Sequence, residues 1–308
     1  MNLPHSEKTG WPWTEGSESL PPTMPDGSPW PKISIVTPSY NQVQYLEETI
    51  RSVLLQGYPN LEYIIIDGGS TDGSVEIIKK YEPWLTYWVT EKDKGQSNAI
   101  NKGFRHASGE LIGWINSDDI FFPLAFKEVV FYWVENDRPK ALITGTKLKG
   151  NSTLDKISRL EQFPHTIKHL LEKNIIEQPS TFYPVELLKE VGYIDERYKM
   201  SMDYDLWLRM AKQGADLIFL NKDLAVTRVY PETKTSRFRQ RSLFEVLQSV
   251  WRNFRVIPEP WLKKFITVMV VPDGIKSTLL KKLFFSNRNI IFLLSVKILK
   301  TFNLLDYS

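Results

Sequence analysis

Gly113-Trp114-Ile115-Asn116-Ser117-Asp118-Asp119 is the segment from which the organisation of this chain can be worked out. The apolar run that begins after Glu110 and continues into this segment is short enough to be a buried strand. Two adjacent carboxylates repel each other and end a strand poorly, but their hard oxygen ligands suit a divalent cation. Adjacent Asp residues can also cap a helix, and Pro123 can open one. Their position directly after a buried strand favours the metal site.

The composition is that of an ordinary globular protein, with 42% hydrophobic and 24% charged residues. A chain of 308 residues can bury a large core, as one domain or as one domain with an appendage. The absence of cysteine excludes disulfides and thiolate metal sites, and it fits a reducing compartment. The sequence shows neither a signal-peptide pattern nor an apolar stretch of about 18 residues that could span a membrane. We therefore expect a cytoplasmic protein.

The net charge of +3 hides an asymmetry. The region Arg228–Ser308 contains 15 Lys and Arg against 5 Asp and Glu, a balance of +10, which leaves −7 for the residues before it. Within this region, Trp261–Val271 and Leu283–Leu305 mix apolar with basic residues. The pattern fits an interfacial helix on an anionic membrane surface. It also fits a solvated basic face, a pair of helices packed on the main domain, or a dimer contact.

Residues 1–31 hold seven prolines with Gly and Ser between them. This composition predicts an extended arm without a core of its own, which Trp11, Trp13 and Trp30 would pin to the domain surface. We expect the main domain to span 32–250 and a basic amphipathic helical tail to span 251–308.

Strands and helices alternate through the first part of the main domain. We expect strands at 33–37, 63–66, 86–90 and 111–115, and helices after Asn41 as an N-cap, at 74–81 and at 95–107. This order predicts an α/β doubly wound, mostly parallel sheet with right-handed crossovers. Ligands of such sheets bind outside the carboxyl ends of the strands. The rule places 37–41, Asp67, 91–93 and 116–119 along one crevice.

The second half is less regular. We expect helices at 123–135, 164–173, 184–191, 204–212 and 242–253, and strands at 140–144, 216–220 and 225–229. Asp203 stands where an N-cap belongs, which needs no further role. As a general base, Asp203 would have to face the crevice and remain ionised near pH 7. Spacing alone leaves both interpretations open.

The turn Asp67–Gly73 contains three glycines and two carboxylates. Its amides could approach an anion or a planar base, and its carboxylates could hold a base edge or ribose hydroxyls. It could equally be a strand-to-helix turn with Asp72 or Ser74 as a cap, and the residues alone favour this. Because GxGxxG and GxxxxGKS motifs are both absent, neither a dinucleotide fingerprint nor a P-loop is predicted.

Five blocks in order carry a family resemblance: Ile35–Asn41, Ile66–Ser74, Glu91–Gly103, Trp114–Asp119, and Gln178–Phe182 followed by Met202–Arg209. Together they resemble the family two glycosyltransferases with the GT-A fold, of the bacterial non-processive type, over roughly residues 30–250. The resemblance implies a Rossmann-like, mostly parallel sheet flanked by helices, with a helical C-terminal appendage.

The resemblance also implies the roles of residues around a nucleotide-sugar donor. Thr37, Pro38, Tyr40 and Asn41 would lie against the nucleotide base and ribose, and Asp67 would accept from the base, commonly uracil. Asp93 and Gln96 would border the diphosphate and the donor sugar. Asn116 replaces the first Asp of the family's Asp-x-Asp motif. Asp118 and Asp119 would then carry the ribose and metal contacts, with Mn²⁺ or Mg²⁺ as the cofactor.

Asp203 falls on the acidic position of the family's Glu-Asp motif, which is the catalytic base, and Met202 replaces the preceding Glu. The family often has Arg-x-His after the last strands, where this chain has Arg228 and Tyr230. Tyrosine cannot replace a neutral imidazole as a metal ligand without losing its own proton. The remaining site residues, expected around the acceptor and the end of the metal site, are Gln178, Ser180, Met202, Arg228 and Tyr230. Asn98 stands where relatives often have Asp.

We therefore expect an inverting, metal-dependent glycosyltransferase that moves a sugar from a nucleotide-diphosphate donor, UDP-linked, to an acceptor hydroxyl in cell-surface polysaccharide or glycolipid assembly. A lipid-linked or glycan acceptor favours contact of the tail with the inner face of the plasma membrane. No nucleic-acid partner is expected, and the sugar and oligomeric state stay open. The alternatives are a nucleotidyltransferase, which usually has a basic Gly-rich loop at its first strand, and an inactive nucleotide-sugar-binding module.

Overall fold

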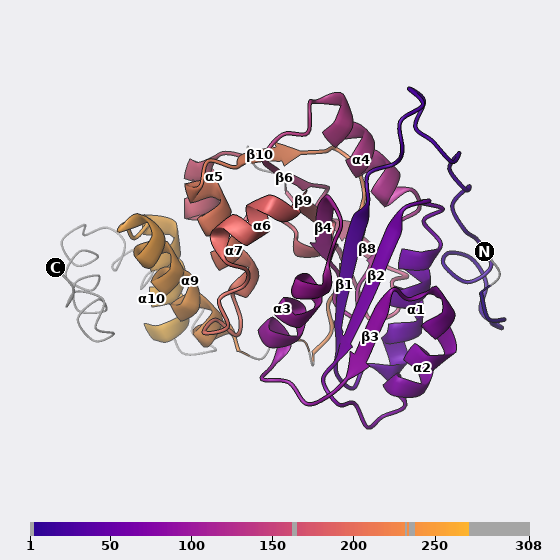
Figure 1. Ribbon diagram of the computed structural model, residues 1–308. Helices are drawn as coiled ribbons and strands as arrows, with labels where there is room; N and C mark the ends of the chain where they lie inside the picture. The colour runs from indigo at the N-terminus through magenta and orange to yellow at the C-terminus, as the bar shows by residue number, and fades with distance from the viewer. Residues whose placement is uncertain (1–2, 162–164, 232, 234–237, 271–308) are drawn as a thin grey trace.

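A central sheet of seven strands organises the protein, and its order is β10-β6-β9-β4-β1-β2-β3. The computed structural model describes residues 3–161, 165–231, 233 and 238–270 (Figure 1). The strands of this sheet are β1 (Ile33–Ser39), β2 (Leu61–Asp67), β3 (Tyr87–Thr90), β4 (Leu111–Trp114), β6 (Ala141–Thr144), β9 (Thr181–Pro184) and β10 (Asp216–Phe219). β1 pairs in parallel with β2 and β4, whereas β9 is antiparallel to both β4 and β6. The predicted mostly parallel α/β sheet is confirmed.

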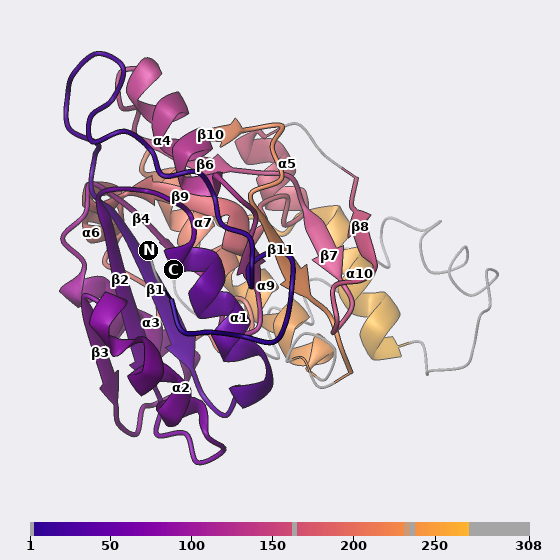
Figure 2. The same ribbon diagram turned by 90° about the vertical axis from the view of Figure 1, so that its right-hand side faces the viewer.

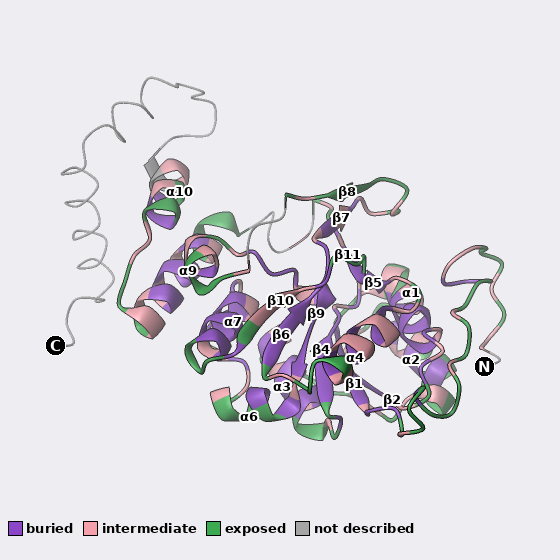
Figure 3. Cartoon of the chain, turned by 90° about the horizontal axis from the view of Figure 1, so that it is seen from above, coloured by how far each residue is buried: buried purple, intermediate pink, exposed green. Residues whose placement is uncertain are grey.

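Helices cover both faces of the central sheet (Figure 1). One face carries α1 (Val43–Leu54), α2 (Ser74–Tyr81) and α4 (Ala125–Glu135); the other carries α3 (Gln96–His106), α6 (Val185–Val191) and α7 (Met202–Lys212). Side chains alternate along a strand, so the apolar run in β2 serves both cores. Ile64 and Ile66 pack with α3, whereas Tyr63 and Ile65 pack with α1. Figure 3 shows the buried strands between helices whose outer sides are exposed.

A smaller sheet lies beside the central one, in the order β5-β11-β7-β8 (Figure 2). Its strands are β5 (Ile120–Phe121), β7 (Leu148–Gly150), β8 (Ile157–Arg159) and β11 (Ala225–Arg228). β11 pairs with β5 antiparallel and with β7 in parallel. Since β5 begins directly after Asp119, this pairing brings the end of β11 to the carboxylates that follow β4.

The N-terminal arm lies against α1 and the β5 segment. The indole Nε1 of Trp11 donates to the carbonyl of Phe121 at 2.9 Å, and Trp30 is 3% exposed. Arg51, buried in α1, donates from its guanidinium to the carbonyls of Pro4, Pro12 and Trp13. The arm therefore satisfies its backbone partly through one buried arginine of the main domain.

The C-terminal helices extend beyond α7 (Figure 1). α9 (Arg239–Phe254) crosses residue 250, where the sequence suggested a boundary, and α10 (Glu259–Val270) packs on α9 and on α5 (Ile167–Glu172). Trp261 and Phe265 of α10 are buried in the same core as α7. Across 3–161, 165–231, 233 and 238–270, no helix is long and apolar enough to cross a bilayer. The second tail segment, Leu283–Leu305, lies outside the described residues.

Two predicted helix caps are wrong. α1 is preceded by Gln42, and Asn41 instead uses its Oδ1 to accept from the backbone of Thr71 at 2.9 Å. Asn41 has a φ of 51°, so its backbone is turned away from the cap conformation. α7 begins at Met202 with Ser201 before it, which places Asp203 in the first turn and not at the N-cap.

Candidate active site

The carboxyl ends of β1, β2, β3 and β4 lie side by side along one edge of the central sheet. The register pairs Ser39 with Asp67 and Asp67 with Thr90, so the turn after β2 lies between the segments that follow β1 and β3. Ligands of parallel sheets bind at this edge. The predicted crevice residues are thus neighbours, but their side chains do not all reach the crevice.

The residues at the end of β1 divide into buried and exposed ones. Thr37 is fully buried, and its hydroxyl lies 3.0 Å from that of Tyr63. Pro38 is also buried within the strand. Tyr40 is 61% exposed, although it is large and aromatic. An exposed aromatic ring at this edge is suited to stack on a planar ligand.

Asp67 holds the turn after β2 together. Its Oδ1 accepts from the backbone N–H groups of Gly69 and Ser70 at 3.0 and 2.8 Å and from the Thr90 hydroxyl at 2.8 Å. Its Oδ2 accepts from the Ser70 hydroxyl at 2.5 Å. Those two amides therefore serve the turn and do not point at an anion. Asp72 joins two helices by accepting from Ser74 and from the first residue of α1.

Gly68 leaves room between Tyr40 and Asp93. A Cβ at Gly68 would lie 2.6 Å from Oδ2 of Asp93 and 3.3 Å from a ring carbon of Tyr40. Because 2.6 Å is closer than real Cβ contacts, a side chain at this position would displace one of the two neighbours. Asp93 itself accepts from the backbone of Gly95 at 2.6 Å. The glycine thus keeps a gap between an exposed aromatic ring and a carboxylate.

Three side-chain amides form a hydrogen-bonded chain at the carboxyl end of β4. Gln96 donates from Nε2 to Oδ1 of Asn116 at 2.7 Å, and Asn116 donates from Nδ2 to Oε1 of Gln178 at 2.9 Å. Gln178 then donates to the carbonyl of Trp114 at 2.6 Å. Gln178 opens the short helix η2 (Gln178–Ser180), whose last residue is fully buried. Asn116 and Gln178 therefore lie together, whereas Ser180 does not reach the crevice.

Asp119 is buried, with 1% of its surface exposed. Its Oδ1 accepts from the backbone N–H of Arg228 at 2.9 Å, and its Oδ2 accepts from Asn116 at 3.1 Å. Burial raises the pKa of Asp119 well above the ordinary value, and the negative charge of Asp118 raises it further. Asp119 thus ties β11 to the end of β4 with both of its oxygens engaged inside the protein.

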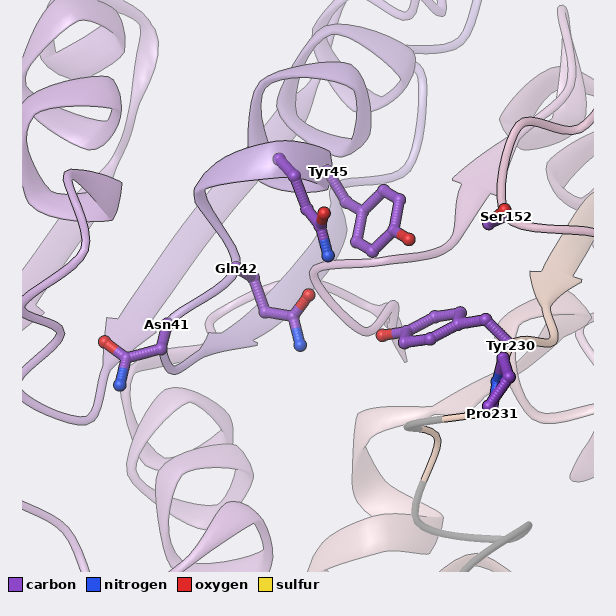
Figure 4. Close-up of a pocket in the computed structure, with 7 residues that line it drawn as sticks. Asn41, Gln42, Tyr45, Ser152, Tyr230 and Pro231 are labelled. Carbon is purple, nitrogen blue, oxygen red and sulfur yellow. The ribbon is translucent and has the colours of Figure 1, made fainter.

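Asp118 faces the opposite way, toward Tyr230. The Tyr230 hydroxyl donates to Oδ2 of Asp118 at 2.8 Å, and the ring of Tyr230 lies 5.3 Å from the ring of Tyr45. Both rings line a pocket of about 430 Å³, into which Figure 4 shows them projecting from opposite sides. The pocket is lined by Asn41, Gln42, Gln44, Tyr45, Ser152, Tyr230 and Pro231. Burial and the charge of Asp118 both raise the pKa of Tyr230, so its hydroxyl remains a donor near neutral pH.

Arg228 fixes the backbone of the segment that contains Asp118. Its Nη1 donates to the carbonyl of Asp118 at 2.8 Å, and its Nη2 donates to Glu48 at 2.6 Å. Its guanidinium also lies 4.8 Å from the ring of Tyr45. Arg228 is 2% exposed, so these contacts fix the backbone at Asp118 and do not present a free cation to solvent.

The residues at this edge suit a divalent cation that is held partly by the protein and partly by a substrate. Within the described ranges, no group of three or more His, Cys, Asp or Glu side chains converges on one point. Mg²⁺ in proteins is commonly held by one or two carboxylates together with substrate phosphates and water. Asp118 is hydrogen-bonded to Tyr230, which lines the pocket, and suits this arrangement, whereas Asp119 is buried with both of its oxygens bound inside the protein.

Asp203 lies in the first turn of α7, half-buried. Burial raises the pKa of its carboxyl, the charge of Glu177 raises it further, and the charge of Lys147 opposes the shift. Over the described part of the chain, no side chain donates a hydrogen bond to this carboxylate. Met202, which precedes it, is buried with its sulfur 2.8 Å from the Ser97 hydroxyl. Asp203 therefore has a raised pKa, and the hydrogen bonds that its carboxylate accepts come from backbone N–H groups, among them that of Tyr204.

Sequence reasoning missed Glu177 and Lys147. Their side chains form an ion pair at 3.2 Å, and Glu177 also accepts from the Thr227 hydroxyl at 2.5 Å. The negative charge of Glu177 raises the pKa of both Asp119 and Asp203, so Glu177 influences the protonation of both carboxyls. Glu177 directly precedes the Gln178 block, which is a signal that could have identified it. Lys147 has no comparable sequence signal, because it comes from a loop in the irregular second half.

Comparison with known sequences identifies relatives over most of the chain. The model of the family described as "Glycosyl transferase family 2" matches residues 34–187. A glycosyltransferase of Rickettsia typhi is 28% identical over 233 residues, which cover 73% of this chain and 71% of that protein. TuaG of Bacillus subtilis, a glycosyltransferase provisionally assigned to teichuronic acid biosynthesis, is 28% identical over 232 residues, covering 74% and 88%.

Solved structures share the fold at lower sequence identity. Residues 1–349 of S. aureus TarS, in complex with UDP-GlcNAc, match with a TM-score of 0.59 at 17% identity, covering 77% of this chain and 72% of that one. The chain spans 46% of a longer TarS structure. The mannosyltransferase PcManGT from Pyrobaculum calidifontis, in complex with GDP-Man and Mn²⁺, matches with a TM-score of 0.59 at 18% identity, covering 96% and 80%. These likenesses confirm the GT-A-like architecture.

The family model covers half of the chain, including the segments after β1, β2, β3 and β4 that line the crevice. The relatives at the sequence level are themselves glycosyltransferases. The chain therefore belongs to glycosyl transferase family 2, and it is a glycosyltransferase.

Proposed function

We propose that this enzyme transfers a sugar, with inversion, from a nucleoside-diphosphate sugar to an acceptor hydroxyl, and that Asp203 is the general base. The observation that carries this assignment is the state of Asp203. Its carboxyl has a raised pKa and no side-chain donor within the described residues, in a site where the neighbouring carboxylates are committed to protein partners. A base is most effective when its pKa is close to the working pH.

The nucleotide would bind at the ends of β1, β2 and β3. Tyr40 is the exposed ring against which the base would stack, and Gly68 leaves the gap beside it. Asp67 would meet the base edge, after exchanging at least one of its present donors within the turn. The relatives TarS and PcManGT are described with UDP-GlcNAc and GDP-Man, which supports a nucleotide sugar as the donor. We propose a UDP-linked donor.

The diphosphate would lie beside the pocket that Tyr230 lines, next to Asp118. Asp118 would hold a divalent cation, Mn²⁺ or Mg²⁺, and this ion would supply neutralising charge for the leaving diphosphate. PcManGT, with Mn²⁺ in its complex, supports this cofactor. Gln96 and Asn116 would border the donor sugar, since their amides face the crevice from α3 and from the end of β4.

The chemical step then needs little from the protein beyond orientation and one proton acceptor. The acceptor hydroxyl gives its proton to Asp203 while its oxygen forms a bond to the anomeric carbon. The bond from that carbon to the diphosphate oxygen breaks on the opposite side, so the nucleoside diphosphate leaves and the configuration inverts. The hydrogen-bonded amides of Asn116 and Gln178 would fix the protein surface between Asp203 and the diphosphate.

A thermal-shift panel tests the donor site. UDP-glucose, UDP-galactose, UDP-GlcNAc and GDP-mannose are added to the full chain with Mn²⁺ and, separately, with EDTA. A ligand at about 100 times its Kd stabilises a protein by about 2.7 kcal/mol, which gives a measurable rise in melting temperature. We expect at least one UDP-sugar to raise the melting temperature with Mn²⁺ and to lose most of this effect in EDTA. No shift with any nucleotide sugar would contradict the proposal.

The provisional assignment of TuaG to teichuronic acid biosynthesis supports a place in cell-surface polysaccharide assembly. A lipid-linked or glycan acceptor would approach from the side of α7, where Asp203 lies. A membrane contact at the inner face of the plasma membrane is proposed for the basic tail. A liposome flotation assay tests it: the full chain should bind anionic vesicles, and equal recovery with neutral vesicles would exclude an electrostatic contact.

A further inference from the structure

A second pocket, of about 390 Å³, opens between α3, α7 and the segment 192–197 that follows α6. These three helices lie on the same face of the central sheet (Figure 1). The charged and aromatic side chains that line the pocket are Arg105, Tyr193, Asp195, Glu196, Arg197 and Arg209. It shares no lining residue with the pocket beside Tyr230. We refer to it as the α3–α7 pocket.

The charges of the α3–α7 pocket are balanced within the protein. Asp195 accepts from Nε and Nη2 of Arg197 at 2.9 and 2.5 Å. Arg209 donates from Nε to Asp205 at 2.7 Å. The remaining arginine and the remaining carboxylate of the lining add one charge of each sign. Because the arginines are matched by carboxylates, the pocket suits an uncharged polar ligand better than an anion.

Arg209 brings a hydrogen-bond donor without a partner to this pocket. Its Nη1 donates to the carbonyl of Val191 at 2.6 Å, but its Nη2 is buried without a hydrogen-bond partner among the residues that the structure describes. A buried donor that is left unsatisfied carries a free-energy penalty. A ligand oxygen that reaches Nη2 would remove this penalty. Arg209 therefore favours a ligand that accepts hydrogen bonds.

Tyr193 supplies an aromatic surface to the same pocket. Its φ is 67°, in the left-handed region, which is uncommon for an aromatic residue. Its backbone N–H donates to the carbonyl of Leu188 in α6 at 3.2 Å, which holds this conformation. The guanidinium of Arg105 lies 5.6 Å from the centre of the ring. The half-buried ring is thus held at the pocket despite its backbone strain.

The segment after the pocket runs along α3 toward the crevice. Glu196 accepts from Nδ2 of Asn98 at 3.1 Å, and the neutral amide suits this contact because an Asp at position 98 would repel Glu196. Lys199 donates to the carbonyl of Lys94, just before α3, at 3.3 Å. α7 then begins at residue 202, with Asp203 in its first turn. The pocket and the proposed base are therefore linked by one short segment.

The pocket lies at a distance from the reacting groups. A helix rises about 1.5 Å per residue, so Arg209 is about 9 Å along α7 from Asp203, and Arg105 is about 13 Å along α3 from Gln96. A single sugar ring is shorter than either separation, whereas a chain of sugar units can span them. The pocket is thus placed to hold a part of the substrate that is remote from the accepting hydroxyl.

We infer that the α3–α7 pocket binds a sugar unit of an oligosaccharide acceptor, remote from the hydroxyl that attacks the donor. This inference rests on the proposed function and names the chemical class of its second substrate. A sugar ring presents C–H groups that pack on an aromatic ring, and hydroxyls that both donate and accept. The pocket offers the ring of Tyr193, guanidinium donors and carboxylate acceptors. A prenyl lipid has no hydroxyls to match these polar groups.

The test measures the binding of tetrasaccharides to the full chain by saturation-transfer NMR, in EDTA and without donor. The probes are maltotetraose, cellotetraose, chitotetraose and mannotetraose, and the variants are Tyr193→Gly and Arg105→Ala. Tyr193→Gly removes the ring and suits the left-handed backbone, so it should fold at least as well as the wild type. Asp137→Gly is the matched control, because Asp137 is exposed, has a φ of 59° and does not line the pocket.

We expect at least one tetrasaccharide to bind the wild type, and both pocket variants to bind it at least about fivefold more weakly. Asp137→Gly should stay within about twofold of the wild type, as a surface change outside the pocket. With the UDP-sugar that binds best, the same tetrasaccharide should increase UDP release, and Tyr193→Gly should raise its KM without changing UDP affinity. Melting curves check folding, and Tyr193→Asn replaces Tyr193→Gly if that variant does not fold.

Four outcomes would overturn the inference. They are no binding of any tetrasaccharide, equal binding by Tyr193→Gly and the wild type, binding without an effect on UDP release, and binding of inorganic phosphate alone that Arg105→Ala abolishes. The last outcome would make the pocket an anion site. UDP affinity, measured separately with Mn²⁺, keeps the two proposals apart. UDP binding without tetrasaccharide binding contradicts this inference alone, and tetrasaccharide binding without UDP binding contradicts the proposed function.

Discussion

The Tyr230 hydroxyl, from a residue that lines the pocket, donates a 2.8 Å hydrogen bond to Oδ2 of Asp118 in the segment after β4. Tyr230 lies two residues after Arg228, whose side chain and backbone fix Asp118 and Asp119. At the position where the family often has a metal-binding His, this chain therefore has a hydrogen-bond donor. The neutral phenol donates a hydrogen bond to the carboxylate oxygen, but it is not a metal ligand at neutral pH.

Replacement of Tyr230 by histidine should strengthen metal-dependent nucleotide binding. A neutral imidazole can ligate Mn²⁺, which tyrosine cannot do while it keeps its proton. We expect Tyr230→His to tighten UDP binding in Mn²⁺ by about tenfold at pH 8, and to lose this gain below about pH 6, where the imidazole is protonated. Calorimetric titration of UDP with and without Mn²⁺ measures the change.

Tyr230→Phe is the control for this substitution, because it removes the hydroxyl and keeps the ring beside Tyr45. The pH dependence of its UDP affinity in Mn²⁺ should match that of the wild type between about pH 6 and 8, since no imidazole has been added. If Tyr230→His and Tyr230→Phe behave alike, Tyr230 does not lie within reach of a metal held by Asp118.

The pKa of Asp203 predicts how stability depends on pH. Because burial raises the folded-state pKa of this carboxyl, the folded protein holds its proton more tightly than the unfolded chain does. The Asp203 carboxyl therefore does not lower the free energy of unfolding at pH values below its unfolded-state pKa. Its destabilising effect grows as pH rises from the unfolded-state pKa to the folded-state pKa. Asp203→Asn should be more stable than the wild type at pH 8 and equal to it near pH 3.

Urea unfolding of both proteins across this pH range measures that difference. Asp205 provides the comparison in the same helical turn, because it accepts from Arg209 and Ser249. Asp205→Asn should destabilise the protein at pH 8, since it weakens a buried ion pair. A destabilised Asp203→Asn at pH 8 would show that the Asp203 carboxylate has partners that stabilise its charge.

Gly68→Ala should weaken UDP binding with little change in stability. The added Cβ would lie 2.6 Å from Asp93 and 3.3 Å from Tyr40, so one of these side chains must move out of the gap. We expect at least about a tenfold loss of UDP affinity, equivalent to about 1.4 kcal/mol. Gly16→Ala is the control, because its Cβ would meet only Leu55 at the ordinary distance of 3.4 Å. Equal UDP affinity of Gly68→Ala and wild type would move the base-binding site away from Tyr40.

Arg51→Met should loosen the N-terminal arm. The guanidinium satisfies the carbonyls of Pro4, Pro12 and Trp13, and a buried carbonyl left without a donor costs about 1–3 kcal/mol. We expect a loss of unfolding free energy on the order of 3 kcal/mol and faster proteolysis within residues 3–31. Arg138→Met, which breaks an exposed pair with Glu110, should cost less than about 1 kcal/mol. Similar losses for the two variants would mean that the arm contributes little.

The parts of the fold that the sequence predicted are those with a local pattern. β2 is an apolar run and α3 follows a glycine at a φ of 106°, and both patterns are complete within a few neighbouring residues. β9 has no such pattern, because its four residues are placed by antiparallel pairing with β4 and β6, both distant in the chain. The two-residue strand β5 likewise depends on β11.

The site residues likewise divide into those that a local sequence pattern predicts and those that only long-range contacts bring together. Asp118, Asp119 and Asn116 follow one buried strand, so their proximity follows from their order in the chain. Glu177 and Lys147 meet through a loop contact that no periodicity marks. Asn41 and Asp203 have the residue types of helix caps, but the cap depends on where the first turn closes. The neighbouring residues Gln42 and Ser201 occupy those positions.

The central claim is that Asp203 activates an acceptor for attack on a nucleotide sugar. The most direct test follows the products of UDP-GlcNAc, or of the UDP-sugar that stabilises the protein best, by ³¹P NMR. We predict that the wild type releases UDP, and that Asp203→Asn releases it ~10²–10⁴-fold more slowly with unchanged UDP affinity. Release of pyrophosphate would indicate a nucleotidyltransferase, and wild-type turnover by Asp203→Asn would contradict the assignment of the base.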